Sequence, residues 1–206
     1  VANYKTINLL ESKQLNLIND MIKNVNVNKE IEVELRFGIL KQSFNPKISK
    51  QSFIDILRKV ESFGFQKTVD DFIDVYSENI RTRYIFSNEF GKYIFFDSII
   101  KNRISKIDIT MQSVINYDVR IAMSSEVKVK QYNTTGESYR KYRISFTEPN
   151  GLFRLDFTAI TSGDYSDRSF VMNKDSNETF QIEIEFLKND IDVNNLFKFI
   201  TQMLAT

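Results

Sequence analysis

Two short segments, far apart in the chain, carry closely spaced carboxylates that could bind a cation. The segment IEVELRFG contains Glu32 and Glu34, and the segment QIEIEFL contains Glu183 and Glu185. Side chains of a strand alternate between its two faces, so each pair shares one face and the apolar residues occupy the other. Two such carboxylates lie about 6–7 Å apart and repel each other by about 2–3 kcal/mol at an effective dielectric constant of about 20. A divalent cation would relieve this repulsion, and we therefore predict a metal site.

The chain contains no His and no Cys, which restricts the chemistry that it can perform. A histidine base, a Ser–His nucleophile, a thiol nucleophile and imidazole or thiolate metal ligands are all excluded within this sequence. Carboxylates remain as bases and ligands, and they suit hard cations such as Mg²⁺ and Mn²⁺. The 28 basic and 27 acidic residues give a net charge of +1, so an electrostatic function would depend on local segregation of charge.

Between the two acidic segments, further segments alternate charged and apolar residues with the period of a strand. These segments are residues 72–76, 79–86, 93–105, 107–113, 117–123, 126–132, 139–147 and 153–160. We also predict a turn at Gly38 and a loop at residues 162–175. The common explanation is an antiparallel sheet with one solvated face. The alternative is a sheet closed into a barrel with its charged faces inward, which requires paired charges or a bound polyanion with metal.

Three amphipathic helices are expected to cover the apolar face of this sheet. The first is predicted over residues 9–25, where apolar residues recur at helical spacing. The second follows Ser49 as its N-cap and stops at Gly64, and the third follows Asp192 as its N-cap.

The chain is expected to form a single domain. Its 206 residues suit one β-barrel, and no linker or repeat divides them. The chain begins at Val1 instead of Met and ends within a helical pattern, so we expect residues 1–206 to be excised from a longer polypeptide. No apolar run approaches the ~20 residues of a membrane span, and no signal peptide is recognisable, which favours a soluble intracellular protein without a membrane partner.

Five motifs, in a fixed order, resemble those of a known enzyme family. They are IEVELRFG, YDVRIAMSSE, KYRISF, RLDFT and QIEIEF. The chain resembles the metal-dependent RNA triphosphatases of mRNA capping in fungi, protozoa and large DNA viruses, which belong to the triphosphate tunnel metalloenzymes. The resemblance implies an α+β fold that is predominantly antiparallel β. It would be an eight-stranded, tunnel-like barrel with a charged interior, covered outside by about three helices.

The resemblance also implies roles for the residues that match the family's motifs. The metal ligands would be Glu32, Glu34 and Glu185. The catalytic residues would be Glu126 and Glu183, which match positions that bind metal-bound or attacking water, together with Lys141 and Arg143. The phosphate path would be lined by Arg83, Lys101, Lys141, Arg143 and Arg154, with Asp156 and Thr158 in support.

Four other residues of the alternating segments keep open roles. Gln181 stands where the family often has a further Glu, and it cannot supply charge. Arg36 shares a face with the first pair of carboxylates and would neutralise them. Arg103 and Arg120 are either functional or structural pairing charges.

The expected function is hydrolysis of the γ-phosphate of a 5′-triphosphate RNA end, which leaves a 5′-diphosphate end and is the first step of mRNA capping. Such a reaction depends mainly on positioning and charge stabilisation, which metal, Arg and Lys supply. The resemblance further implies manganese-dependent hydrolysis of free nucleoside triphosphates. We expect a monomeric N-terminal domain of a giant-virus capping enzyme, with a fused or associated guanylyltransferase, located in the virion or the host cytoplasm.

Two other functions compete with this expectation. The first is a thiamine triphosphatase or inorganic tripolyphosphatase of the same fold. Those relatives typically carry Glu-x-Glu-x-Lys, whereas this chain has Glu-x-Glu-x-Arg. The second is a non-catalytic domain that binds RNA ends or other polyanions, for which clustered carboxylates offer no advantage.

Overall fold

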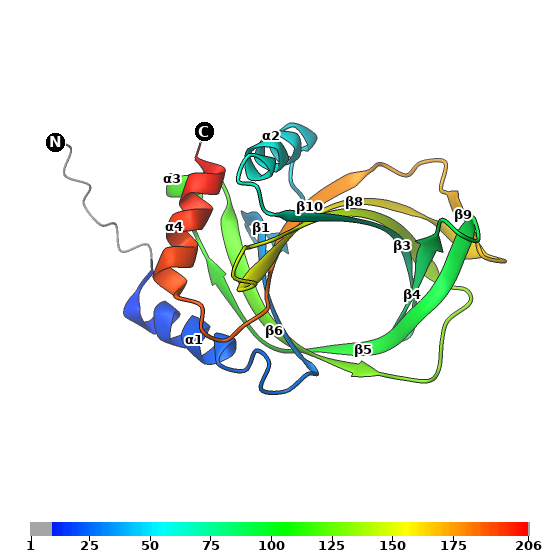
Figure 1. The fold of residues 1–206 in the computed structure, drawn as a ribbon, viewed down its shortest axis with the longest axis horizontal. Coiled ribbons are helices and arrows are strands. Elements are labelled where there is room, and N and C mark those ends of the chain that lie inside the picture. The colour runs from blue at the N-terminus through cyan, green and yellow to red at the C-terminus, as the bar shows by residue number, and fades with distance from the viewer. Residues whose placement is uncertain (1–9, 206) are drawn as a thin grey trace.

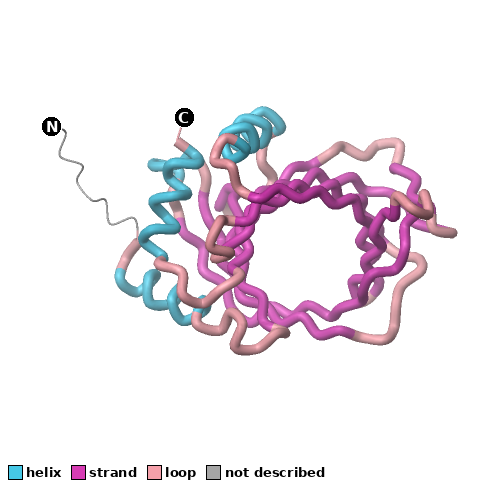
Figure 2. Tube along the Cα trace, viewed as in Figure 1, coloured by secondary structure: helices cyan, strands magenta, loops and turns pink. Residues whose placement is uncertain are grey.

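The computed structural model describes residues 10–205, and eight strands of this part of the chain close into an antiparallel barrel (Figure 1, Figure 2). Their order around the barrel is β10-β1-β6-β5-β4-β3-β7-β8, and β8 pairs with β10 to close it. The predicted tunnel-like barrel is therefore confirmed. The strands of the barrel are β1 Ile31–Leu40, β3 Gln66–Ser77, β4 Ile80–Ser87, β5 Lys92–Ile109, β6 Asp118–Lys128, β7 Glu137–Thr147, β8 Phe153–Ser166 and β10 Thr179–Phe186.

The barrel turns its apolar side chains outward and its charged side chains inward. In β1, Leu35 and Phe37 are fully buried beneath the covering helices, whereas Glu34 and Arg36, which alternate with them, line the interior. The same alternation in β10 buries Ile184 outside and directs Glu185 inside. An ordinary sheet with a solvated charged face is therefore wrong for this chain, and the closed barrel with a charged interior is correct.

Three helices of about three turns pack outside the barrel, with a single-turn helix beside them. They are α1 Ser12–Ile22, α2 Lys50–Glu61 and α4 Val193–Leu204, and the short one is α3 Gln112–Ile115. Both predicted N-caps are present: the Ser49 hydroxyl accepts a hydrogen bond from the Ser52 N–H at 3.2 Å, and the Asp192 carboxylate accepts one from the Asn195 N–H at 2.8 Å. Residue 9 of the predicted first helix lies outside the described residues.

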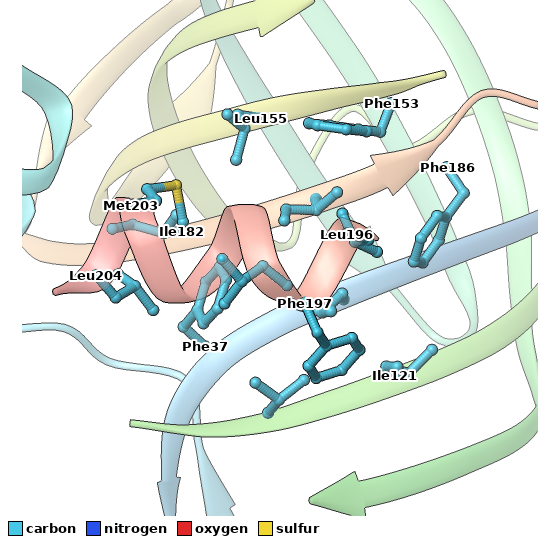
Figure 3. Close-up of a cluster of buried hydrophobic side chains, with 14 of the residues drawn as sticks. Phe37, Ile121, Phe153, Leu155, Ile182, Phe186, Leu196, Phe197, Met203 and Leu204 are labelled. Carbon is cyan, nitrogen blue, oxygen red and sulfur yellow. The ribbon is translucent and has the colours of Figure 1, made fainter. Parts of the chain in front are cut away.

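The main hydrophobic core lies between the barrel wall and these helices. Figure 3 shows Leu196 and Phe197 of α4 facing Phe37 and Ile121 of the wall, with Leu155 on the neighbouring strands. Burying a side chain of this size stabilises the fold by about 1.5–3 kcal/mol. The core therefore supports the strands from outside, and the interior of the barrel is left to polar groups.

The predicted loop at residues 162–175 is wrong, because this segment is mostly strand. β8 continues to Ser166, and β9 Ser169–Met172 pairs back onto it. The turn between them places Asp167 and Arg168 at φ values of 47° and 64°, in the left-handed conformation. Turns of this kind usually contain Asn-Gly or Asp-Gly, so an Asp-Arg pair does not predict one. The hairpin also covers a second, smaller apolar cluster around Tyr84 and Tyr165.

The predicted turn at Gly38 is also wrong. Gly38 lies inside β1, which continues to Leu40 and pairs with the short strand β2 Phe44–Asn45. A Cβ atom at Gly38 would collide with the Asn45 carbonyl oxygen, so glycine allows the close approach of β2 and does not end the strand.

Two pairs of predicted strands are single strands in the structure. The sequence predicts separate elements at residues 93–105 and 107–113, but β5 runs without a break through the first segment and ends at Ile109 in the second. Its pairing with β6 shifts between Arg103 and Ser105, so a bulge interrupts the alternation there. Similarly, β6 joins residues 117–123 with the start of residues 126–132, and the short strand predicted at residues 72–76 is the centre of the longer β3.

Within residues 10–205, no helix is both long enough and apolar enough to cross a membrane.

Candidate active site

The interior of the barrel is a charged cavity of about 930 Å³, to which all eight strands of the wall contribute side chains. Every residue to which the sequence assigned a site role lines this cavity. These residues are Glu32, Glu34, Arg83, Lys101, Glu126, Lys141, Arg143, Arg154, Asp156, Thr158, Glu183 and Glu185. The alternation of each strand is sufficient to direct them inward, and closure of the barrel brings them together.

The pairing of β1 with β10 builds an acidic wall. Glu34 lies opposite Glu185, and Arg36 lies opposite Glu183, so the two segments that are far apart in sequence become neighbours. Burial, together with the Glu183 charge, raises the pKa of Glu34. Burial also raises the pKa of Glu185 to about 7, against the opposing charge of Arg154 and with a smaller contribution from the charges of Glu32 and Asp156. The neighbouring cations therefore do not fully offset the cost of burying the negative charges of Glu34 and Glu185 in this wall.

Lys101 of β5 lies among three of these carboxylates. Its ammonium contacts Glu32, lies 3.3 Å from Glu126 Oε1 and lies 3.7 Å from Glu34 Oε2. Burial would lower the pKa of Lys101, but the surrounding carboxylates raise it instead. The structure therefore places this predicted phosphate-binding residue within the acidic group, where its ammonium acts as the local counter-ion.

Arg36 and Arg154 neutralise the remaining acidic groups. Arg36 lies 2.9 Å from Glu34 Oε1 and 2.7 Å from Glu183 Oε1, which identifies its partners in this structure. Arg154 donates two hydrogen bonds of 2.8 Å to Asp156 and one of 2.5 Å to Glu185. Such bidentate pairs fix a guanidinium in orientation as well as in position.

The facing basic wall is organised around Asp74 of β3, a residue that belongs to none of the five motifs. This carboxylate is completely buried and accepts hydrogen bonds from Arg83 at 2.7 and 2.9 Å and from Lys141 at 2.8 Å. Burial alone would raise the pKa of Asp74, but Lys141 and Arg83 outweigh it and hold this pKa well below its usual range. Asp74 lies directly opposite Arg83 in the β3–β4 hairpin. This pairing of opposite charges across the hairpin is the sequence feature from which the role of Asp74 could have been predicted.

Phe72 and Thr158 orient the cations deeper in the same wall. The Phe72 ring centroid lies 4.0 Å from the Arg83 guanidinium carbon and 5.1 Å from that of Arg143. Arg143 also donates a hydrogen bond of 3.2 Å to the Thr158 hydroxyl and lies 3.4 Å from Asp156. The predicted supporting role of the RLDFT motif is therefore consistent with its contacts.

The other residues with open roles separate into two groups. Arg120 is held by Asp108 through hydrogen bonds of 2.6 and 2.9 Å and lies under the Phe44 ring, and it is not among the described residues that line the cavity. It is a structural pairing charge. Gln181 and Arg103, in contrast, both line the cavity.

The chemistry of the acidic wall fits a hard divalent cation, although the side chains are arranged around other partners. In residues 10–205, no three acidic side chains already converge as metal ligands. Lys101 and Arg154 hold the carboxylates that would do so, and the ammonium of Lys101, surrounded by three carboxylates, stands in for a cation. Glu32, Glu34 and Glu185 would supply suitable oxygen donors if these side chains turned away.

The Asp74 contacts predict an acid-dependent loss of stability. Asp74→Asn is expected to lower the free energy of unfolding at pH 7 by about 3–5 kcal/mol, because it leaves two buried cations without their anion. The folded-state pKa of Asp74 lies below its ordinary 3.8. Its contribution is therefore complete above pH ~5 and is lost as pH falls through 3.8 towards the folded-state pKa.

Urea unfolding of the parent, Asp74→Asn and the exposed control Asp164→Asn between pH 7 and pH 3 checks this expectation. The difference between the parent and Asp74→Asn should shrink as the pH falls, and Asp164→Asn should follow the parent throughout. A difference that is constant with pH would contradict the assigned ion pairs.

The fold is similar to solved structures of RNA triphosphatases. One is the Schizosaccharomyces pombe RNA triphosphatase Pct1 in complex with the Spt5 CTD, with a TM-score of 0.70 and 12% identity over 95% of this chain and 93% of that chain. Another is the RNA triphosphatase domain of a trifunctional mimivirus mRNA capping enzyme, with a TM-score of 0.62 and 17% identity over 95% of this chain and 97% of that chain. These similarities establish a shared fold.

The sequence itself matches a family model over most of its length. No curated protein sequence matches the chain significantly. The model that does match describes the mRNA capping enzyme, beta chain, and it covers residues 66–202. The resemblance inferred from the five motifs is thereby confirmed, and the chain belongs to the family of the mRNA capping enzyme beta chain.

Proposed function

We propose that this domain removes the γ-phosphate of a 5′-triphosphate RNA end in a reaction that requires a divalent metal. The observation that carries this proposal is the opposition of two walls inside one closed cavity. Glu32, Glu34 and Glu185 line one wall, and Arg83 and Lys141 line the facing wall. A triphosphate needs cations along its length and a metal at its reacting end, and this cavity offers both.

Glu32, Glu34 and Glu185 would hold the metal, for which Mg²⁺ and Mn²⁺ are the candidates. When bound, such a cation neutralises developing charge and polarises the terminal phosphate. The raised pKa values of Glu34 and Glu185 support this assignment. They show that burial destabilises these two carboxylates in their charged form, and a bound cation would stabilise that form.

The cations of the tunnel bind and orient the phosphates. Arg143 and Arg83 offer planar guanidinium groups that match phosphate oxygens, and Lys141 adds a compact charge. Their positions are fixed in advance by Asp74, Thr158 and the Phe72 ring. Preorganised charge of this kind is effective because little reorganisation is needed when the reaction occurs.

Glu126 and Glu183 are the proposed bases for the attacking water. Both line the cavity, and the Glu126 side chain retains an exposed fraction of 27% next to Lys101. As the water oxygen bonds to the γ-phosphorus, a Glu carboxylate accepts the water proton, and the bond to the β–γ bridging oxygen breaks. The diphosphate end of the RNA and inorganic phosphate are the products.

Binding is expected to exchange the partners of the tunnel cations. Lys101 and Arg154 are tied to the acidic wall in the structure. They are free to bind phosphate only when their carboxylates have another cationic partner. The metal would replace Lys101 and Arg154 as the partner of the carboxylates, and the triphosphate would replace the carboxylates as the partner of Lys101 and Arg154. Metal and triphosphate would therefore bind cooperatively.

The domain would act within a larger capping apparatus. The mimivirus relative is the triphosphatase domain of a trifunctional capping enzyme. By analogy, we propose that this chain is one domain of a viral capping enzyme that works as a monomer beside a guanylyltransferase inside the infected cell. Residues 1–206 would then form its N-terminal part.

Hydrolysis of γ-labelled triphosphate RNA, ATP and tripolyphosphate with Mg²⁺ or Mn²⁺ tests the proposed function. RNA should release phosphate with at least one metal, ATP should be cleaved with Mn²⁺, and Glu32→Ala should reduce the rate by about 100- to 1,000-fold, as for other groups that stabilise transition-state charge. The exposed control Glu178→Ala should retain the parent rate. Failure of every substrate would contradict the enzyme assignment, and a strong preference for tripolyphosphate over RNA would contradict the capping assignment.

Thermal unfolding tests the metal ligands without measuring activity. At a Mn²⁺ concentration of about 100 times its Kd, binding should raise the Tm of the parent by about 5–10 °C. Glu185→Ala should remove most of this increase, whereas the exposed control Glu89→Ala should keep it. Equal increases in all three proteins would show that Glu185 is not a ligand.

A further inference from the structure

One end of the tunnel carries an aromatic pair. Tyr76 precedes the last residue of β3, and Tyr139 is the third residue of β7, which pairs with β3 in antiparallel register. Their ring centroids are 6.0 Å apart in an edge-to-face arrangement, and Tyr76 is 36% exposed. Within residues 10–205, these two are the aromatic side chains that line the cavity.

Aromatic rings at this place are not required for binding phosphate. The cavity between the two walls is lined mainly by charged and polar side chains, and the two rings add an aromatic surface at one end of it. Along β7, Tyr139 lies about 7 Å from Lys141 and about 13 Å from Arg143, so the phosphate-binding cations continue inward from the rings. A group attached to the outer end of a triphosphate would therefore meet the tyrosines.

An arginine that forms no ion pair within residues 10–205 lies towards the same end. β3, β4 and β5 follow one another in antiparallel pairs, so β5 runs towards the end at which β3 finishes. Arg103 is two residues further in this direction than Lys101, lines the cavity, and forms no ion pair with any residue from 10 to 205. All the other cations that line the cavity are paired, namely Arg36, Arg81, Arg83, Lys101, Lys141, Arg143 and Arg154.

We propose that Tyr76 and Tyr139 form a subsite that stacks the first nucleobase of the RNA, and that Arg103 binds the phosphodiester that follows it. This inference rests on the proposed function and adds the direction in which the RNA enters. Stacking on an aromatic ring accepts every base, because each base has a π-face. A guanidinium free of carboxylates binds a backbone phosphate without breaking an ion pair.

A purely structural role of the tyrosines makes a different prediction. The Lys141 ammonium lies 5.9 Å from the centroid of the Tyr76 ring, so Tyr76 could act by positioning Lys141. In that case its loss would impair every substrate that contains a triphosphate. A nucleobase subsite affects only substrates that carry a base, and inorganic tripolyphosphate distinguishes the two roles.

The test compares kcat/KM of triphosphate-ended RNA, ATP and tripolyphosphate for Tyr76→Ala and Tyr139→Ala. We expect kcat/KM for RNA and ATP to fall by about 5- to 150-fold, the range that corresponds to the loss of one stacking contact. The kcat/KM for tripolyphosphate should not change. Tyr76→Phe should restore both, because stacking does not need the hydroxyl. Tyr142→Ala, on the outer face of β7 and 47% exposed, is the matched control and should change none of the three.

Arg103→Ala separates RNA from the free nucleotide. This substitution should lower kcat/KM for RNA but leave kcat/KM for ATP unchanged, since ATP has no phosphodiester beyond its nucleoside. The slope of log(kcat/KM) against log salt for RNA should fall by about 0.7, the value for one phosphate contact on a single strand. Arg58→Ala, an exposed arginine on α2, is the charge-matched control.

Equal losses with all three substrates, or no loss with RNA and ATP, would overturn the nucleobase subsite. A loss with ATP in Arg103→Ala would overturn the phosphodiester contact. Where tripolyphosphate is not cleaved, it is measured as a competitive inhibitor of the RNA reaction. A parent protein that cleaves nothing would contradict the proposed function alone, because dissociation constants of labelled RNA and ATP for the same variants still decide the subsite.

Discussion

Pairing of opposite charges inside a closed barrel is the interaction on which the structure depends. A barrel interior excludes enough water to make isolated charges costly, so each inward carboxylate needs a cationic partner. Asp74 obtains Arg83 and Lys141, Glu185 obtains Arg154, and three glutamates share Lys101. These pairs reduce the cost of burying so many charges in the tunnel, and they also hold the cations where a triphosphate would bind.

The outer core makes this interior possible. Because the helices cover the apolar face of the strands on the side of β1, β6 and β10, hydrophobic burial stabilises the wall without filling the tunnel (Figure 1, Figure 3). A barrel of ordinary polarity would pack apolar side chains inside. Here stability and function are placed on opposite faces of the same strands, so a substitution on one face leaves the other largely unaffected.

Features that depend on strand alternation could be predicted from the sequence, whereas features that depend on register could not. The inward direction of Glu32, Glu34 and Glu185 follows from a period of two. The Glu183 partner of Arg36 and the Lys141 partner of Asp74 depend on which distant strands become neighbours when the barrel closes, and local sequence does not encode that. The bulge near Arg103 changes the phase of β5, and the unusual turn at Asp167 conceals the β8–β9 hairpin.

The central claim is that metal and triphosphate replace the internal ion partners of the acidic wall. The most direct measurement is the anomalous diffraction of Mn²⁺ in crystals grown with Mn²⁺ and a non-hydrolysable triphosphate. We expect a manganese peak bounded by Glu32, Glu34 and Glu185, with the Lys101 ammonium turned from the carboxylates towards phosphate. A peak remote from these residues, or Lys101 still in contact with all three of its present partners, would contradict the claim.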